Sequence, residues 1–135
     1  MFIASDASHI TRARRWTGLG ISGIAVLFLG FDILGKLLRV APVVEGTAQL
    51  GFPETAILPI GALLLVCTAA YLIPRTAILG AVLLTGYMGG AVAAHLRIGS
   101  PLLTHVMFPV YVSVFVWGGL FLRDSRVRDV VGPAS

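Results

Sequence analysis

Charged residues are scarce in this chain of 135 residues. Only 12% of the sequence is Asp, Glu, Lys or Arg, whereas 57% is apolar, and the mean hydropathy is +0.95. A soluble domain of this length carries about 25% charged residues, and a disordered chain has fewer aliphatic residues than this one. The composition therefore excludes most soluble folds and indicates a protein that lies in a lipid bilayer.

Cysteine is almost absent as well. The one thiol, Cys67, lies inside an apolar run, so the chain can form neither an internal disulfide nor a Cys-x-x-Cys redox pair. We expect Cys67 to be a small buried apolar residue. The sequence also lacks a Ser-His-Asp order, a phosphate-binding glycine loop, a Rossmann fingerprint and a haem-binding Cys-x-x-Cys-His motif. No cofactor site is evident from motifs, and the sequence leaves open whether the chain is an enzyme.

Four stretches are long enough and poor enough in charge to cross a hydrocarbon core about 30 Å thick, which needs about 20 helical residues. They cover residues 16–38, 55–73, 76–96 and 102–122. Pro74 and Arg75 leave only a tight turn between the second and third stretches. Residues 39–54 mix prolines and glycines with apolar residues, and we expect a partly ordered flap there. The sequence thus predicts an all-α fold in which residues 1–135 form a single membrane domain, a four-transmembrane-helix bundle.

Basic residues outnumber acidic ones, ten against six. In a soluble protein this excess would suggest nucleic acid, but here the basic side chains flank apolar runs and form no stripe with aromatic residues. We therefore expect contact with lipid head groups and no nucleic acid. Seven of the ten flank the termini or the turn at Arg75, which predicts that both termini are cytoplasmic. A cleaved signal peptide is the alternative for the basic N-terminus, but no small-x-small cleavage site follows before Asp32.

Small residues are the expected means of helix association, because apolar burial drives little association inside lipid. Gly86, Gly90 and Ala94 recur every four residues along one face of the third span, and Gly18 with Ser22 gives the first span a shorter version. We expect the third-span face to contact a neighbouring helix of the same chain. A homo-oligomer through Gly86, Gly90 and Ala94 is the alternative.

A proline interrupts the fourth span. Pro109 has no backbone N–H and leaves the carbonyl of His105, four residues earlier, without its usual donor. A bend is expected there, and the freed carbonyl favours a polar opening close to His105. A simple proline kink without a ligand is the alternative.

Five residues that carry a charge or an imidazole are predicted to share one layer near the outer interface. Asp32 lies about 24 Å along the first span, and Lys36 follows one helical turn later, an order that suits an intrahelical ion pair. His95 and Arg97 end the third span, and His105 begins the fourth at the same level. Because such groups are costly to bury in lipid, we interpret all five as candidate ligand-binding residues of a small polar pocket. An interfacial ion pair with a snorkelling lysine is the alternative for Asp32 and Lys36.

The chemistry of this layer favours some ligands over others. A metal ion is not expected, because the histidines lack His-x-x-x-His spacing and because Lys36 and Arg97 would repel a cation. A carboxylate and two imidazoles suit a polar head group or a proton relay instead. Glu45 and Glu54, in or beside the flap, are candidates for pairing with Arg39 or Arg97 and fastening the flap.

Several motifs together resemble the DoxX-like family of small four-helix bacterial membrane proteins. The matching residues are Phe31-Asp32-x-x-x-Lys36-Leu37, Gly51-Phe52-Pro53, the stretches 73–81 and 85–91, His95-Leu96-Arg97, Phe108-Pro109, and Trp117 with Leu122-Arg123. The resemblance covers residues 17–129 and is most specific from Pro74 to Arg97. It implies a multi-pass protein of the bacterial inner membrane.

The resemblance also implies a setting in redox metabolism. The wider DoxX group is named after its similarity to a subunit of a thiosulfate:quinone oxidoreductase, and some members are membrane partners of redox proteins. Many relatives carry an acidic residue in the second span after Pro-x-Gly, whereas here Pro59-Ile60-Gly61 is followed by alanine and leucines. We expect a membrane subunit or a binder of a small lipophilic, quinone-like molecule in redox or oxidative-stress metabolism, with a redox protein as a partner. A small oligomeric exporter of the multidrug type and a membrane scaffold for a soluble enzyme are the alternatives.

Overall fold

The computed structural model describes residues 2–131 of the chain, and it describes side chains within residues 11–130. All regular elements in this range are helical, which confirms the predicted all-α fold. Four segments are long and apolar enough to cross a membrane: Thr11–Leu38, Glu54–Leu72, Pro74–Arg97 and Leu102–Arg123. They contain nearly all of the predicted spans. The chain is therefore a multi-pass membrane protein.

Short helices and turns join the spans. In chain order the elements are α1 (Phe2–Leu38), α2 (Ala41–Gln49), the 3-10 turn η1 (Glu54–Ala56), α3 (Ile57–Leu72), the 3-10 turn η2 (Pro74–Thr76), α4 (Ala77–Arg97), the π-helical turn η3 (Leu102–Val106), α5 (Phe108–Arg123) and α6 (Ser125–Val131).

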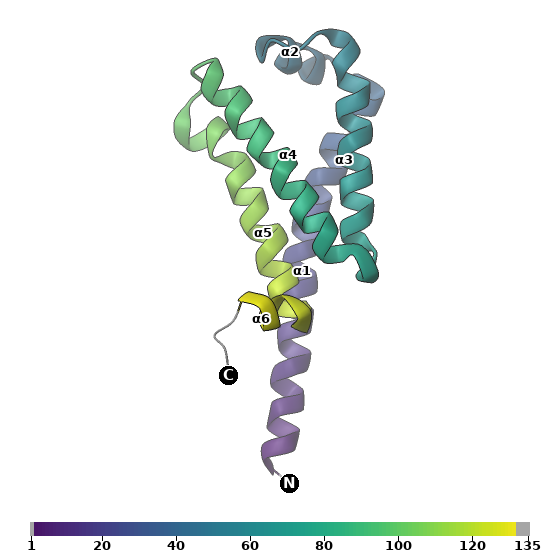
Figure 1. Cartoon of the computed structure of the whole chain (residues 1–135), viewed down its shortest axis with the longest axis vertical. Coiled ribbons are helices and arrows are strands. Elements are labelled where there is room, and N and C mark those ends of the chain that lie inside the picture. The colour runs from purple at the N-terminus through teal and green to yellow at the C-terminus, as the bar shows by residue number, and fades with distance from the viewer. Residues whose placement is uncertain (1, 132–135) are drawn as a thin grey trace.

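The four long helices form a closed bundle. α1 packs against α5 and α3, and α4 packs against α3 and α5. Figure 1 shows that α4 crosses the bundle obliquely, so its C-terminal end lies near the start of α5 and away from the start of α3. The start of α1 and the short helix α6 lie on one side of the bundle, here called the terminal side, and α2 lies on the opposite side, here called the α2 side (Figure 1). The cytoplasmic location of the terminal side stays a prediction.

Apolar side chains face both the interior and the surroundings. Leu64, Leu84 and Leu120 are fully buried, whereas Phe31 is 82% exposed and Leu27 is 75% exposed. Exposed apolar surface on this scale would be an aggregation hazard in water, but acyl chains cover it in a bilayer. Cys67, by contrast, is buried in the core, as the sequence predicts.

Close helix contacts depend on particular glycines. A Cβ atom at Gly18 of α1 would lie 2.7 Å from the carbonyl oxygen of Gly119 in α5, and one at Gly119 would lie 2.2 Å from the hydroxyl oxygen of Ser22. The small-residue face predicted at Gly18 and Ser22 is therefore the α1–α5 contact. Gly80 of α4 has the same role against α3, since its Cβ would lie 2.2 Å from the backbone nitrogen of Tyr71.

The expectation that Gly86 and Gly90 contact a neighbouring helix of the same chain is wrong. Both residues are exposed, and a Cβ atom at either position would meet nothing within 4 Å. α4 turns a different face, which contains Gly80, Ala81 and Leu84, toward the core. The spacing of small residues indicated a smooth face but could not say which face the bundle buries. The homo-oligomer through Gly86, Gly90 and Ala94 stays a prediction.

The fourth span is interrupted near the expected position. The π-helical turn η3 ends at Val106, and α5 begins at Phe108 with Pro109 in its first turn. A proline there costs no backbone hydrogen bond, because the first N–H groups of a helix have no partner within the helix. The break therefore precedes Pro109 and does not kink a continuous helix at that residue.

The predicted flap is more regular than expected. Residues 41–49 form α2, which has no buried residue. Its main contacts are with α1 and with η1. Gly51 follows with a φ of +86°, a conformation that favours glycine. The Arg97 guanidinium donates a hydrogen bond to the carbonyl of Leu50 and fastens this segment to the end of α4. Across the described residues, neither Glu45 nor Glu54 forms an ion pair, so Arg97 binds backbone instead of the predicted carboxylates.

Candidate functional site

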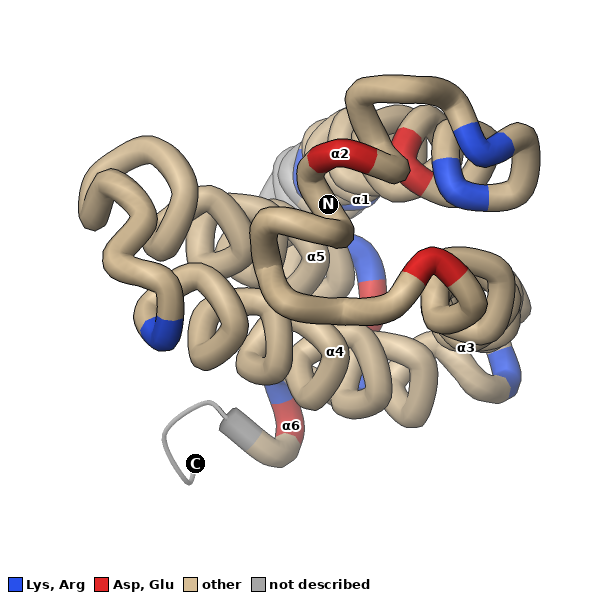
Figure 2. The backbone as a smooth tube through the Cα atoms, turned by 90° about the horizontal axis from the view of Figure 1, so that it is seen from above, with Lys and Arg blue, Asp and Glu red and all other residues tan. Residues whose placement is uncertain are grey.

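The five predicted site residues fall into three separate groups. Asp32 pairs with Lys36 on α1, His95 contacts His105 at the α4–η3 connection, and Arg97 binds the backbone after α2. Within residues 11–130, no hydrogen bond, ion pair or ring contact joins one group to another. Seen from the α2 side, Figure 2 shows charged backbone positions on several helices and not gathered at one point. The shared level predicted from the sequence does not bring the five side chains together.

The Asp32–Lys36 pair lies along the inner edge of α1. The two groups form the predicted i, i+4 ion pair, with the lysine side chain 14% exposed and the aspartate 42% exposed. Lys36 packs closely on α3, since a Cβ at Gly61 would lie 2.9 Å from its Cβ. Asp32 is therefore neither deeply buried nor free of a cationic partner.

The two histidines form a compact pair. Their ring centroids lie 5.8 Å apart in an edge-to-face arrangement. His95 Nδ1 lies 3.2 Å from the Ser100 hydroxyl, and His105 Nδ1 lies 2.8 Å from the Thr104 hydroxyl. These hydroxyls orient both rings, and each Nε2 atom has no hydrogen-bond partner among the described residues.

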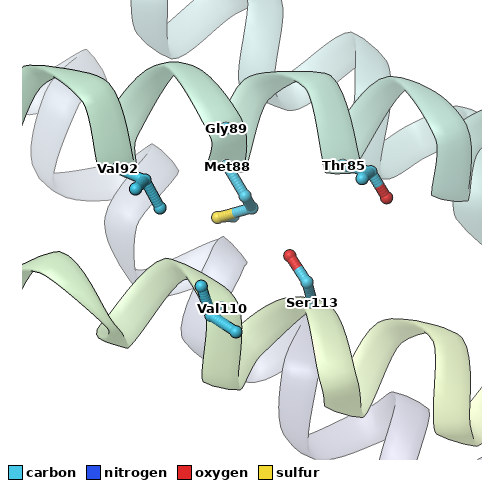
Figure 3. Close-up of a pocket in the computed structure, with 6 residues that line it drawn as sticks. All are labelled: Thr85, Met88, Gly89, Val92, Val110 and Ser113. Atoms are coloured by element: carbon cyan, nitrogen blue, oxygen red, sulfur yellow. The ribbon is translucent and has the colours of Figure 1, made fainter.

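A pocket of about 230 Å³ lies between α4 and α5. Thr85, Met88, Gly89 and Val92 line it from α4, and Val110 and Ser113 line it from α5. Figure 3 shows the Met88 thioether and the Ser113 hydroxyl pointing into the space between the two helices. The lining is apolar except for two hydroxyls. None of the five residues predicted from the sequence lines this pocket.

The histidine pair lies beyond the end of the pocket that faces the α2 side. His95 follows Val92 by three residues on α4, so both lie on the same face of the helix. His105 precedes Val110 on the other side of the α4–α5 connection. His95 therefore lies about one turn beyond the pocket on α4, and none of His95, His105, Asp32, Lys36 and Arg97 lines the pocket.

Trp117 contacts Thr85, the lining residue nearest the terminal side. Its indole Nε1 donates a 2.7 Å hydrogen bond to the hydroxyl of Thr85, which links α5 to α4. Thr85 in turn donates to the carbonyl of Ala81 at 2.7 Å. The sequence singles out Trp117 only among the residues of the family resemblance, and nothing in its spacing from Thr85 indicates this contact.

A buried polar network near the terminal side was missed entirely. The Arg123 Nε donates to the Ser22 hydroxyl at 3.1 Å, and the Tyr71 hydroxyl donates to the carbonyl of Val116 at 2.8 Å. Because Tyr71 uses its proton in this way, the 2.8 Å contact between Ser22 and Tyr71 must have Ser22 as its donor. The Arg123 guanidinium also lies 5.1 Å from the centre of the Tyr71 ring. This network ties α1, α3 and α5 together.

A second polar contact on the terminal side fixes α6. Arg126 forms an ion pair with Asp124 at 2.8 Å and donates to the carbonyl of Pro74 at 2.6 Å, which connects α6 to the α3–α4 turn. Hydrogen bonds from Arg126 hold the pKa of Asp124 below its ordinary value. Asp124 also caps α6, since it accepts the backbone N–H of Arg126 at 2.9 Å.

Within the described part of the chain, no group of three or more His, Cys, Asp or Glu side chains is arranged to hold a metal ion. Comparison with known protein families matches residues 20–119 to the DoxX-like family. No curated protein and no solved structure matches the chain. The matched range begins within α1 and ends within α5, so it contains the pocket and both histidines.

Proposed function

Because the chain belongs to the DoxX-like family, we propose that it binds a small lipid-soluble molecule of the quinone type within the bilayer and acts as a membrane component of redox metabolism. The redox setting rests on the family resemblance. The ligand class rests on one observation, the largely apolar pocket between α4 and α5. The pocket opens where Gly89 and Val110 are exposed, so a ligand could enter it from the lipid.

The size of the pocket suits a single substituted ring. Its volume of about 230 Å³ is below the range of about 300–1,000 Å³ that is typical of pockets for drug-sized ligands. It exceeds the about 150 Å³ of an engineered apolar cavity that holds benzene. A quinone head group matches this volume, and its tail would extend into the surrounding acyl chains.

The histidine pair supports the same ligand class. A head group in the pocket would place an oxygen atom toward the α2 side, where the Nε2 atoms of His95 and His105 have no partner among the described residues. An imidazole nitrogen donates or accepts a hydrogen bond, depending on the tautomer. It can therefore bind either a carbonyl or a hydroxyl of the ligand.

The arrangement does not favour a cation exporter. Such a transporter would need a carboxylate free to bind its substrate, whereas Asp32 is already paired with Lys36. A cationic substrate would have to displace this lysine, which is largely buried against α3.

Quenching of Trp117 fluorescence tests the proposal. Trp117 contacts the pocket residue Thr85, and the Trp16→Phe substitution removes the other tryptophan, which is 69% exposed. In phosphatidylcholine nanodiscs we expect decylubiquinone to quench Trp117 saturably, because a site fills. Collisional quenching from the lipid would instead rise steadily with the mole fraction of the quinone.

Two glycine substitutions locate the site. Gly89→Leu adds a side chain to the pocket lining, and its Cβ meets nothing within 4 Å. Gly23→Leu on α1 is the matched control, because Gly23 is exposed and equally unobstructed but lies on another helix. We expect the first variant to lose saturable quenching and the second to keep it. Saturable quenching in both variants, or in neither, would contradict the proposed site.

A further inference from the structure

The two hydroxyl groups in the α4–α5 pocket are not equivalent. We infer that Ser113 is the polar anchor of this pocket and that it selects ring-sized ligands carrying a carbonyl or hydroxyl oxygen. This inference rests on the proposed binding of a small lipid-soluble molecule. It adds the chemical group by which the pocket distinguishes such a ligand from an acyl chain.

The hydroxyl of Thr85 is already committed to protein contacts. It donates its proton to the Ala81 carbonyl and accepts the indole N–H of Trp117, each at 2.7 Å. A hydroxyl has one proton and two lone pairs. Thr85 therefore holds the indole N–H in addition to its own bond to the carbonyl, and a ligand that displaced Trp117 would leave that N–H group without its partner.

The hydroxyl of Ser113 is free to exchange partners. It donates to the carbonyl of Pro109 at 2.9 Å and accepts no hydrogen bond from the described residues. In α5 that carbonyl also accepts the backbone N–H four residues later, the regular helical bond. Rotation of the Ser113 hydroxyl toward a ligand thus leaves no buried carbonyl unsatisfied. The same oxygen can instead accept a proton from a ligand hydroxyl.

The surroundings of Ser113 make this single group selective. Figure 3 shows Met88 of α4 between Ser113 and the valines Val92 and Val110, and Val110 lies one turn from Ser113 on α5. A ligand with one suitably placed oxygen gains a hydrogen bond in an apolar site. An acyl chain gains none, and the hydroxyl then keeps its bond to the Pro109 carbonyl. The difference corresponds to one neutral hydrogen bond, or about a three- to tenfold preference.

A comparison of two ligands in three proteins tests the inference. In the Trp16→Phe background, duroquinone binding is followed directly by the quenching of Trp117 fluorescence. Hexamethylbenzene is then added as a competitor. It is a six-membered ring of similar size that carries methyl groups where duroquinone has carbonyl oxygens. We expect Ser113→Ala to weaken duroquinone binding about three- to tenfold and to leave hexamethylbenzene unchanged. Ser113→Thr, which restores a hydroxyl, should restore the duroquinone affinity.

The outcomes separate this inference from the proposal it rests on. If Ser113→Ala weakens the binding of both ligands equally, Ser113 contributes only packing. If it weakens the binding of neither, Ser113 contributes nothing. Either result refutes the inference but leaves the proposed pocket intact. If wild type binds hexamethylbenzene as tightly as duroquinone, the pocket accepts any apolar filler and the inference fails in the same way. If neither ligand binds to wild type, the proposed function fails and takes the inference with it. Matching thermal unfolding curves for the variants show that each remains folded.

Discussion

Substitution of Gly80 by alanine is expected to separate α3 from α4. The new Cβ would lie 2.2 Å from the Tyr71 nitrogen, 2.5 Å from the Tyr71 Cα and 2.7 Å from the carbonyl carbon of Ala70. All three are backbone atoms, so no side-chain rotation relieves the clash. Because ordinary contact begins at 3.4 Å, the two helices must move apart by more than an ångström.

The expected cost follows from two opposing effects. Overpacking of a well-packed contact costs about 1–3 kcal/mol, and a rigid backbone neighbour puts Gly80→Ala at the upper end of that range. The higher helix propensity of alanine offsets up to about 1 kcal/mol of this destabilisation. We therefore expect the free energy of unfolding to fall by about 2 kcal/mol, and by more if the displaced Tyr71 also loses its hydrogen bonds.

Gly90→Ala is the matched control for this change. It makes the same substitution in the same helix, but a Cβ at Gly90 meets nothing within 4 Å. We expect its free energy of unfolding to stay the same or to rise by up to about 1 kcal/mol. The assay is reversible unfolding in mixed micelles, followed by circular dichroism as the fraction of denaturing detergent increases. Equal stability of the two variants would show that α3 and α4 do not approach each other as described.

Three further predictions concern polar contacts. Tyr71→Phe leaves the Ser22 proton without its acceptor and should lower the free energy of unfolding by about 1–2 kcal/mol in the same assay; unchanged stability would count against the network. Arg97→Ala removes the tie to the segment after α2, so amide hydrogen exchange in residues 41–52 should accelerate while exchange in α3 stays the same; uniform acceleration would indicate general destabilisation instead. Asp124→Asn keeps a capping oxygen but removes the ion pair with Arg126, so hydrogen exchange in α6 should accelerate at neutral pH. Because the pKa of Asp124 is lowered in the folded state, wild type should keep this protection at neutral pH and lose it as the pH falls through that lowered pKa, below the ordinary 3.8; protection that persists there would contradict the role of the carboxylate.

The four spans were predictable from the sequence because the signal is simple. About 20 residues without charge can scarcely lie anywhere but in a bilayer, and a tight turn at Pro74 forces neighbouring spans to run in opposite directions. The i, i+4 pairing of Asp32 with Lys36 was predictable for a similar reason, since it depends only on helix geometry. Each of these inferences uses information local to one segment.

The lateral arrangement was not predictable in the same way. Counting residues along each helix placed Asp32 and His95 at one level, but the oblique course of α4 carries its C-terminal end toward α5 and away from α3 (Figure 1). Spacing likewise selected Gly86 and Gly90, whereas the contact with α3 is made by Gly80, which belongs to no repeat. The direction and rotation of a helix depend on which neighbours it packs against, and a single sequence does not contain that information.

The distribution of hydrogen bonds explains why the pocket forms where it does. Trp117 and Thr85 tie α5 to α4 at the terminal side of the pocket, and the contact between His95 and His105 joins them again toward the α2 side. Between these two ties, the described residues supply no side-chain hydrogen bond from α4 to α5, and packing alone holds that stretch together. Gly89 lies within it and presents no side chain to an incoming ligand. A molecule arriving from the lipid can therefore part the two helices there without breaking a side-chain hydrogen bond between them.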